Sequence, residues 1–117
     1  MSNIIVLFEA TIKEGKLKDY IDKAASLKEQ LLTFDGFISS ERFESLNTDR
    51  KILSKSQWRD EISVKKWRNL TEHRLYQQQG RENYFENYKI TVVSPLRTYT
   101  MDLRKEAPLD SNNFFNI

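Results

Sequence analysis

The sequence predicts an α+β domain of the ferredoxin-like type, in which a βαββαβ chain forms a four-stranded antiparallel sheet with helices on one face. Two observations support this prediction. Apolar residues recur with a period of two in four segments and with a helical period in the segments between them. The chain has 117 residues with only three glycines and two prolines, which suits a single domain with short connections.

The first strand is predicted at residues 3–12, which are rich in β-branched and apolar types. Its alternation places five side chains on one face: Ile4, Val6, Phe8, Ala10 and Ile12. After Gly15, apolar residues follow helical spacing and predict an amphipathic helix over 16–33. The turn signal Asp35-Gly36 separates this helix from the next strand.

A β-hairpin is predicted next, with strands at 37–46 and 52–58 and the polar turn 47–50 between them. Phe37 and Phe43 are expected on one side of its first strand. Because a helical crossover joins the first strand of the chain to this hairpin, the first two strands should run parallel.

Asp60 is a suitable N-cap for the helix that follows the hairpin. Thr71 is expected to cap a second helical piece over 72–86, which Gly80 bends or weakens. The last strand is predicted at 88–99, at an edge of the sheet.

The sheet needs a partner on its second face, because two helices cover only one face of four strands. Several residues are apolar on the face away from the helices: Ile5, Leu7, Ile38, Leu53 and Val93. An exposed patch of this kind favours a homodimer that forms through the open sheet face. The alternative is that these side chains belong to the core.

Composition excludes several kinds of site. The chain has no cysteine and one histidine, which rules out disulfides, thiolate chemistry and histidine-rich metal sites. No apolar run is long enough for a membrane helix, and the apolar start lacks the features of a signal peptide, so we expect a cytoplasmic protein. The net charge of +2 is too small to indicate nucleic acid. An RNA-binding ferredoxin-like domain is disfavoured as well, because the strand at 52–58 has no glycine and only one aromatic residue.

Residues 102–117 differ in composition from the rest of the chain, with Asp, Ser, Asn and Pro108. They are predicted to be either a disordered tail or an arm whose Phe114 and Phe115 dock on the body or on a partner subunit. The folded domain is accordingly assigned to residues 1–101.

Trp67 and His73 are the candidate catalytic residues. Trp67 lies on the apolar stripe of its helix, where its indole N–H can meet an aromatic substrate or a core partner. His73 has the one side chain whose ordinary pKa lies near neutrality. Its place in the first turn of a helix favours a neutral imidazole that can accept a phenolic proton. The alternatives are a core tryptophan and an exposed or capping histidine.

Other candidates are less specific. Tyrosines near the end of the second helical region can line the mouth of a pocket, and an arginine there can steady a phenolate. These residues are Arg74, Tyr76, Arg81, Tyr84, Phe85 and Tyr88. Glu9 and Glu41 are candidate inward carboxylates. Hydroxyl groups are plentiful at Ser39, Ser40, Ser54 and Ser56, but no Gly-x-Ser-x-Gly motif accompanies them.

Over about residues 3–100 the chain resembles the antibiotic biosynthesis monooxygenase family of dimeric α/β barrel proteins. The resemblance rests on four segments: Asp35-Gly36-Phe37, Trp58-Arg59-Asp60-Glu61, Val64 with Trp67, and Glu72-His73-Arg74. It implies a dimer with a cavity between the sheet and the helices of each subunit. It also implies oxygenation of small aromatic phenols or hydroquinones by dioxygen, without metal or flavin.

The predicted function is therefore a cofactor-independent monooxygenase with Trp67 and His73 as catalytic residues. The predicted substrate-binding residues are Phe8, Arg74, Tyr76, Tyr84 and Phe85. A non-catalytic, small-molecule-binding or stress-related dimer of the same fold is the alternative. A related branch that degrades haem is disfavoured, because only its tryptophan has a match, at Trp67. Its asparagine and histidine positions hold Phe8 and Gln77, and His73 lies one turn too early.

Overall fold

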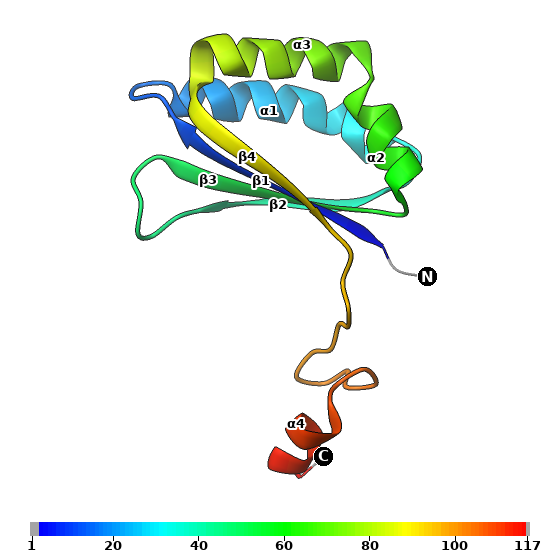
Figure 1. Cartoon of the computed structure of the whole chain (residues 1–117). Helices are drawn as coiled ribbons and strands as arrows, with labels where there is room; N and C mark the ends of the chain where they lie inside the picture. Colours follow the sequence, from blue (N-terminus) through cyan, green and yellow to red (C-terminus); the bar gives the residue numbers. More distant parts are fainter. Residues whose placement is uncertain (1–2, 117) are drawn as a thin grey trace.

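The sheet has four strands, and every neighbouring pair is antiparallel. The computed structural model describes residues 3–116, and its strands take the order β2-β3-β1-β4 (Figure 1). The strands are β1 (Ile4–Ile12), β2 (Phe37–Glu44), β3 (Lys51–Trp58) and β4 (Phe85–Val93). This is the order of a ferredoxin-like fold, so the predicted fold class is confirmed. β1 and β2 run parallel, as predicted from their helical connection.

Three helices cover one face of the sheet. They are α1 (Leu17–Leu32), α2 (Glu61–Arg68) and α3 (Thr71–Gln79). Figure 1 shows α1 and α3 side by side above the sheet, with α2 at one end of this layer. The prediction of a helix over 16–33 agrees with α1 to within one residue at each end. No helix in the described part of the chain is long and apolar enough to cross a membrane.

The register of β1 assigns side chains to the two faces of the sheet. Paired residues on neighbouring strands point to the same face, and successive residues alternate. Ala10 and Ile12 are buried under the helices, on what we call the inner face. On the opposite, outer face, Ile5 is paired with Val93, and Glu9 is paired with Leu53. Most of the apolar patch predicted for the open face therefore lies there.

β2 departs from the predicted alternation near its start. Its register with β3 shifts between Phe37 and Ser39, so Ile38 is an extra residue on this strand. Phe37 pairs with Trp58 on the inner face, whereas Phe43 lies on the outer face. The prediction that Phe37 and Phe43 share one side is wrong, because the bulge reverses the alternation between them.

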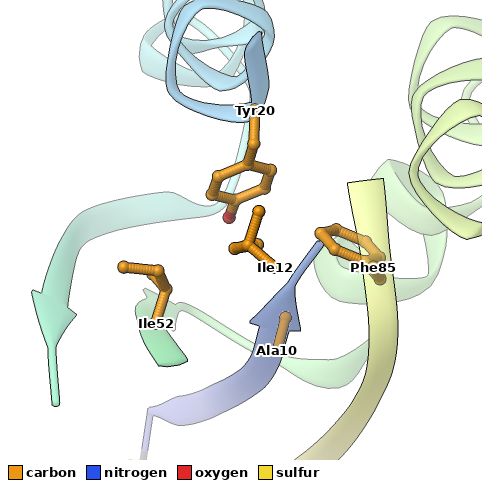
Figure 2. Packing of buried hydrophobic residues seen from close by; sticks show 5 residues of the cluster. All are labelled: Ala10, Ile12, Tyr20, Ile52 and Phe85. Carbon is orange, nitrogen blue, oxygen red and sulfur yellow. The ribbon is translucent and has the colours of Figure 1, made fainter. Parts of the chain in front are cut away.

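The buried core lies at one end of the space between α1 and the sheet. Five residues form it: Ala10, Ile12, Tyr20, Ile52 and Phe85. Figure 2 shows the Tyr20 ring pointing from α1 toward Ile12 and the sheet. The rings of Tyr20 and Phe85 meet edge to face, with their centroids 5.5 Å apart. This packing anchors α1 to the sheet at this end.

A π-helical turn, η1 (Gly80–Tyr84), connects α3 directly to β4. A Cβ atom on Gly80 would lie 2.6 Å from the ring of Phe85, so the turn needs glycine where the chain passes this buried ring. The predicted helix over 72–86 and strand over 88–99 are both wrong at their boundary. Phe85 already belongs to the sheet, and β4 ends six residues earlier than predicted.

The segment after β4 leaves the sheet and carries the short helix α4 (Leu109–Phe114). Figure 1 shows it extending away from the body of the domain, in orange and red. The Arg104 guanidinium organises it by donating hydrogen bonds to Asn112 Oδ1 and to Ser111 Oγ, both at 2.7 Å. The domain boundary after residue 101 stays a prediction. Residues 1, 2 and 117 of the two predicted ranges lie outside the described part of the chain.

Candidate active site between the helices and the sheet

A cavity lies between the inner face of the sheet and the helices, with a volume of about 180 Å³. Phe8 on β1 and Ile90 on β4, which are paired in the sheet, lie at its floor. An engineered apolar cavity of about 150 Å³ in a protein core is large enough for benzene. The volume therefore suits a compound built on a single ring and is far too small for a porphyrin.

The start of α2 fixes the direction of the helix that lines one end of the cavity. Asp60 is the predicted N-cap, and its Oδ1 accepts hydrogen bonds from the Ser63 amide at 2.8 Å and hydroxyl at 2.7 Å. These bonds, with help from Arg59, lower the pKa of Asp60 to about 2, so the cap is charged at neutral pH. Arg59 also donates two hydrogen bonds to Asp35, which joins α2 to the loop after α1.

Trp67 lies in the last turn of α2 and closes this end of the cavity. Its ring centroid is 5.2 Å from that of Phe34 and 6.3 Å from that of Trp58. The Trp58 indole N–H donates a hydrogen bond to Ser56 Oγ at 2.9 Å. Trp67 is only 7% exposed and still lines the cavity. It therefore satisfies both alternatives considered for it, core residue and cavity residue.

His73 lies in the first turn of α3, with its ring centroid 5.1 Å from that of Trp67. The residue is half-buried and lines the cavity. Its Nδ1 is buried and has no hydrogen-bond partner among the described residues. Burial, with the Arg74 charge as a smaller cause, lowers the pKa of His73 to about 4. The imidazole is therefore neutral at pH 7, and a residue of the cavity lining carries a buried polar atom without a partner.

The start of α3 differs from the prediction in one respect. Leu70 is the residue at the N-cap position and makes no side-chain cap, whereas Thr71 is already helical. The prediction that Thr71 caps this helix is therefore wrong. The placement of His73 in the first turn was predicted correctly. The Glu72 side chain, which belongs to the Glu-His-Arg segment, lies outside the described part of the structure.

Tyr76 faces the cavity one turn after His73. Burial raises the pKa of its phenol well above the usual value, and the neighbouring Tyr20 adds to this effect. The positive charge of Arg42 on β2 acts in the opposite direction, toward a lower pKa of Tyr76. Tyr76 is consequently a neutral hydrogen-bonding group at all ordinary pH values.

The structure brings most of the predicted site residues together. Five of the seven line the cavity: Phe8, Trp67, His73, Tyr76 and Phe85. Arg74 is exposed and donates a hydrogen bond to Asn69 Oδ1, and Tyr84 packs against the core cluster instead. Neither of these two is among the lining residues.

The candidate inward carboxylates are both on the outer face. Glu9 forms ion pairs with Lys51 at 3.7 Å and Lys89 at 3.2 Å. Glu41 is paired with Lys55 in the sheet. The prediction of an inward orientation is therefore wrong for both. Among the described residues, no group of three or more His, Asp or Glu side chains is placed to hold a metal ion.

Several cavity residues were not predicted as site residues. Trp58 and Arg42 line the cavity, and so do three of the four serines considered earlier, namely Ser40, Ser54 and Ser56. Counting back from Trp58 with a period of two would have found the two serines on β3. The same count along β2 would not have found Arg42, because the bulge in β2 reverses the face of the sheet on which Arg42 lies.

Comparison with known proteins points to one family. The family model described as antibiotic biosynthesis monooxygenase matches residues 3–79. A jasmonate monooxygenase, ABM, from Pyricularia oryzae is 38% identical over 87 residues, which cover 74% of this chain. The chain spans 40% of the length of that curated relative.

Solved structures share the fold. A protein from Mycobacterium tuberculosis has a TM-score of 0.75 at 17% identity and covers 85% of this chain and 100% of its own. SnoaB, a cofactor-independent oxygenase from Streptomyces nogalater, has a TM-score of 0.74 at 9% identity. That match covers 84% of this chain and 97% of SnoaB. At these identities the likeness concerns the fold alone.

Proposed function

Because this chain belongs to the antibiotic biosynthesis monooxygenase family, we propose that it is a monooxygenase that oxygenates a small aromatic phenol or hydroquinone without metal or flavin. The cavity is the reaction site in this proposal. Its volume of about 180 Å³ and its aromatic walls support a substrate built on one ring.

The unpartnered Nδ1 of His73 is the observation that carries this proposal. A buried polar atom without a partner is unfavourable, and in this proposal a small rotation of the His73 ring opens Nδ1 to a phenolic hydroxyl that donates to it. Trp67, whose ring centroid lies 5.1 Å from that of His73, would hold the substrate ring against this acceptor. Tyr76, protonated because burial raises its pKa, offers a hydroxyl on the same helix.

The proposed reaction needs only a weak base. A phenol that gives one electron to dioxygen becomes strongly acidic, so an imidazole with a pKa of about 4 can accept the proton at that moment. The phenoxyl radical and the reduced oxygen species then combine at a ring carbon. Loss of water leaves a quinone, so one phenol and one dioxygen give one quinone and one water. The four electrons that dioxygen accepts all come from the substrate.

Oxygen uptake with model hydroquinones in flavin-free buffer tests this proposal, with mass spectrometry of products formed under ¹⁸O₂. We expect uptake with incorporation of one labelled atom, and a fall of about 10²-fold or more for His73→Gln. Trp67→Phe should also be slower. Gln78→Ala, on the exposed side of α3, is the matched control and should retain the rate of the unmodified protein. Ligand binding without uptake would instead support the non-catalytic alternative.

A second candidate substrate is jasmonate, which the name of the Pyricularia oryzae relative supports. Identity of 38% over 74% of this chain is the specific observation in its favour. The same assay with jasmonate as the added substrate distinguishes the two candidates. Uptake with jasmonate and none with any hydroquinone would replace the aromatic substrate by a jasmonate-like one.

We also propose that the protein is a homodimer that forms through the outer face of the sheet. Phe43 on β2 is 43% exposed and lies opposite Leu53 of β3 on the outer face, where Ile5 of β1 also pairs with Val93 of β4. Ile38, the extra residue of β2, is 48% exposed. Apolar side chains on the face that the helices leave open favour association, and a two-fold arrangement pairs this face with itself. This arrangement leaves the inner-face cavity of each subunit accessible.

A further inference from the structure

The charged side chains around the cavity are all positive. Lys28 on α1, Arg42 on β2 and Arg68 on α2 line it, and none of the described lining side chains is a carboxylate. The chain as a whole is nearly balanced, with 19 basic and 17 acidic residues. A wall with three cations and no acid is therefore a local feature. It creates a positive potential where a ligand would bind.

Arg42 is the one of these three cations that lies on the sheet, and like the other two it is an exposed residue. It lies on the inner face of β2, and its guanidinium carbon is 6.0 Å from the centroid of the Tyr20 ring. Tyr20 is only 1% exposed, so this contact holds the guanidinium against a fixed surface. None of the ion pairs formed by the described side chains includes Arg42.

Hydroxyl groups surround Arg42 on the same face. Ser54 on β3 is directly opposite Arg42, and Ser40 is directly opposite Ser56. All three serines are half-buried and line the cavity. The Ser56 oxygen already accepts from the Trp58 indole, so its own proton is available to donate.

The cavity consequently has two unlike walls. β1 and β4 supply apolar and aromatic side chains such as Phe8 and Ile90, whereas β2 and β3 supply one guanidinium and three hydroxyls beside Trp58. A guanidinium with neighbouring hydroxyl donors matches the two oxygens of a carboxylate. A neutral phenol or hydroquinone would leave most of these donors unused.

We propose that the cavity binds a small carboxylic acid, with its ring on the apolar wall and its carboxylate bound by Arg42 and the serines of β2 and β3. This inference rests on the proposed function, because it assumes that the cavity is the ligand site. It adds to that function the chemical class of the substrate and a specificity residue outside the Trp67–His73 pair.

Two matched compounds test this inference: 4-hydroxyphenylacetate and its neutral counterpart 2-(4-hydroxyphenyl)ethanol. Both tryptophans of the chain, Trp58 and Trp67, line the cavity, so quenching of their fluorescence at pH 7.5 measures binding. We expect the acid to bind about tenfold or more tightly than the alcohol. Arg42→Gln should remove this preference by weakening the acid and leaving the affinity for the alcohol within about threefold.

Two further variants test whether the preference for the acid depends on the position of Arg42 or only on the total positive charge. Arg68→Gln removes the same charge from the α2 side of the cavity, away from the serines of β2 and β3, and should weaken the acid less than Arg42→Gln does. Arg97→Gln removes it from the exposed segment after β4 and should have no effect. Circular dichroism confirms that each variant is folded.

Three outcomes would overturn the inference. Equal affinity of the unmodified protein for the acid and the alcohol removes the carboxylate preference but leaves the ligand-binding cavity in place. Equal weakening of both compounds by Arg42→Gln assigns Arg42 a structural role. Binding of neither compound rejects the cavity as a site for single-ring phenols, and the proposed function then fails together with the inference.

Discussion

The imidazole of His73 and the indole of Trp67 lie at 44° to each other with their centroids 5.1 Å apart, although they belong to different helices. This contact explains why the histidine is poor in water contacts and why its charged form is disfavoured. It also makes the protonation state of His73 a sensitive measure of the packing between α2 and α3.

The stability of the protein should fall in mildly acidic solution because of His73. Its pKa is lowered from 6.5 to about 4 in the folded state. Between these values the unfolded chain binds more protons, so the free energy of unfolding decreases as the pH is lowered. The slope contributed is at most about 1.4 kcal/mol per pH unit. Urea titrations at several pH values measure it.

His73→Gln is the control for this effect, since glutamine does not titrate. Its free energy of unfolding should depend less on pH between about 6.5 and 4 than that of the unmodified protein. Asp60, whose pKa falls from 3.8 to about 2 on folding, loses its contribution mainly below pH 4 and is present in both proteins, so its effect cancels in the comparison. Parallel curves for the two proteins would contradict the burial of a neutral histidine.

Gly80→Ala should destabilise the protein although alanine favours helices. The new Cβ would lie 2.6 Å from Cε2 of Phe85, which is itself only 6% exposed and has little freedom to move. We expect a loss of about 1–3 kcal/mol, which exceeds the gain of about 1 kcal/mol in helix propensity. Gln78→Ala, at an exposed position of α3, should be neutral or slightly stabilising. Equal stability of the two variants in urea would refute the steric role of Phe85.

Phe43→Glu should convert the proposed dimer to a monomer. Phe43 is 43% exposed on an edge strand and contributes to the apolar outer face. A carboxylate buried at a two-fold interface is costly, and symmetry doubles the effect. Sedimentation velocity should then give a mass near 13.9 kDa. Ile62→Glu, at a 64% exposed position on α2, should leave the dimer intact.

Removal of residues 102–117 should leave the domain folded and its cavity unchanged. The Arg104 side chain donates hydrogen bonds to Asn112 and Ser111 within this segment and to the Thr100 carbonyl just before it, and Thr100 lies beyond the end of β4. We therefore expect a change in melting temperature of no more than about 2 °C and unchanged tryptophan fluorescence. A loss of folding would place residues of this segment in the domain. Loss of the dimer alone would support the docking-arm alternative.

The sequence was sufficient for the elements that local patterns define. Asp60 could be identified as an N-cap because its interaction with the Ser63 amide is local. The end of the second helical region was not predictable in this way. Helical periodicity continues through Phe85, and only its pairing with Ile12 of β1 shows that the chain has already entered the sheet.

The candidate site was predictable to a similar degree. Trp67 and His73 were identified as candidates from residue type and position, and the structure brings them together at one cavity. Their catalytic roles stay predictions. Arg42 could not be predicted as a cavity residue, because a single extra residue in β2 decides which face of the sheet it occupies. A change of register is a tertiary property that alternation within one strand does not reveal.

The pairing of Ile5 with Val93 has a consequence for how this fold can be built into larger proteins. The chain enters β1 and leaves β4 at the same end of the sheet, next to each other (Figure 1). Another polypeptide joined at either end, or this whole unit inserted into a loop of a host protein, would need little change in the path of the backbone. The topology of the domain therefore suits its fusion to other proteins or its insertion into them.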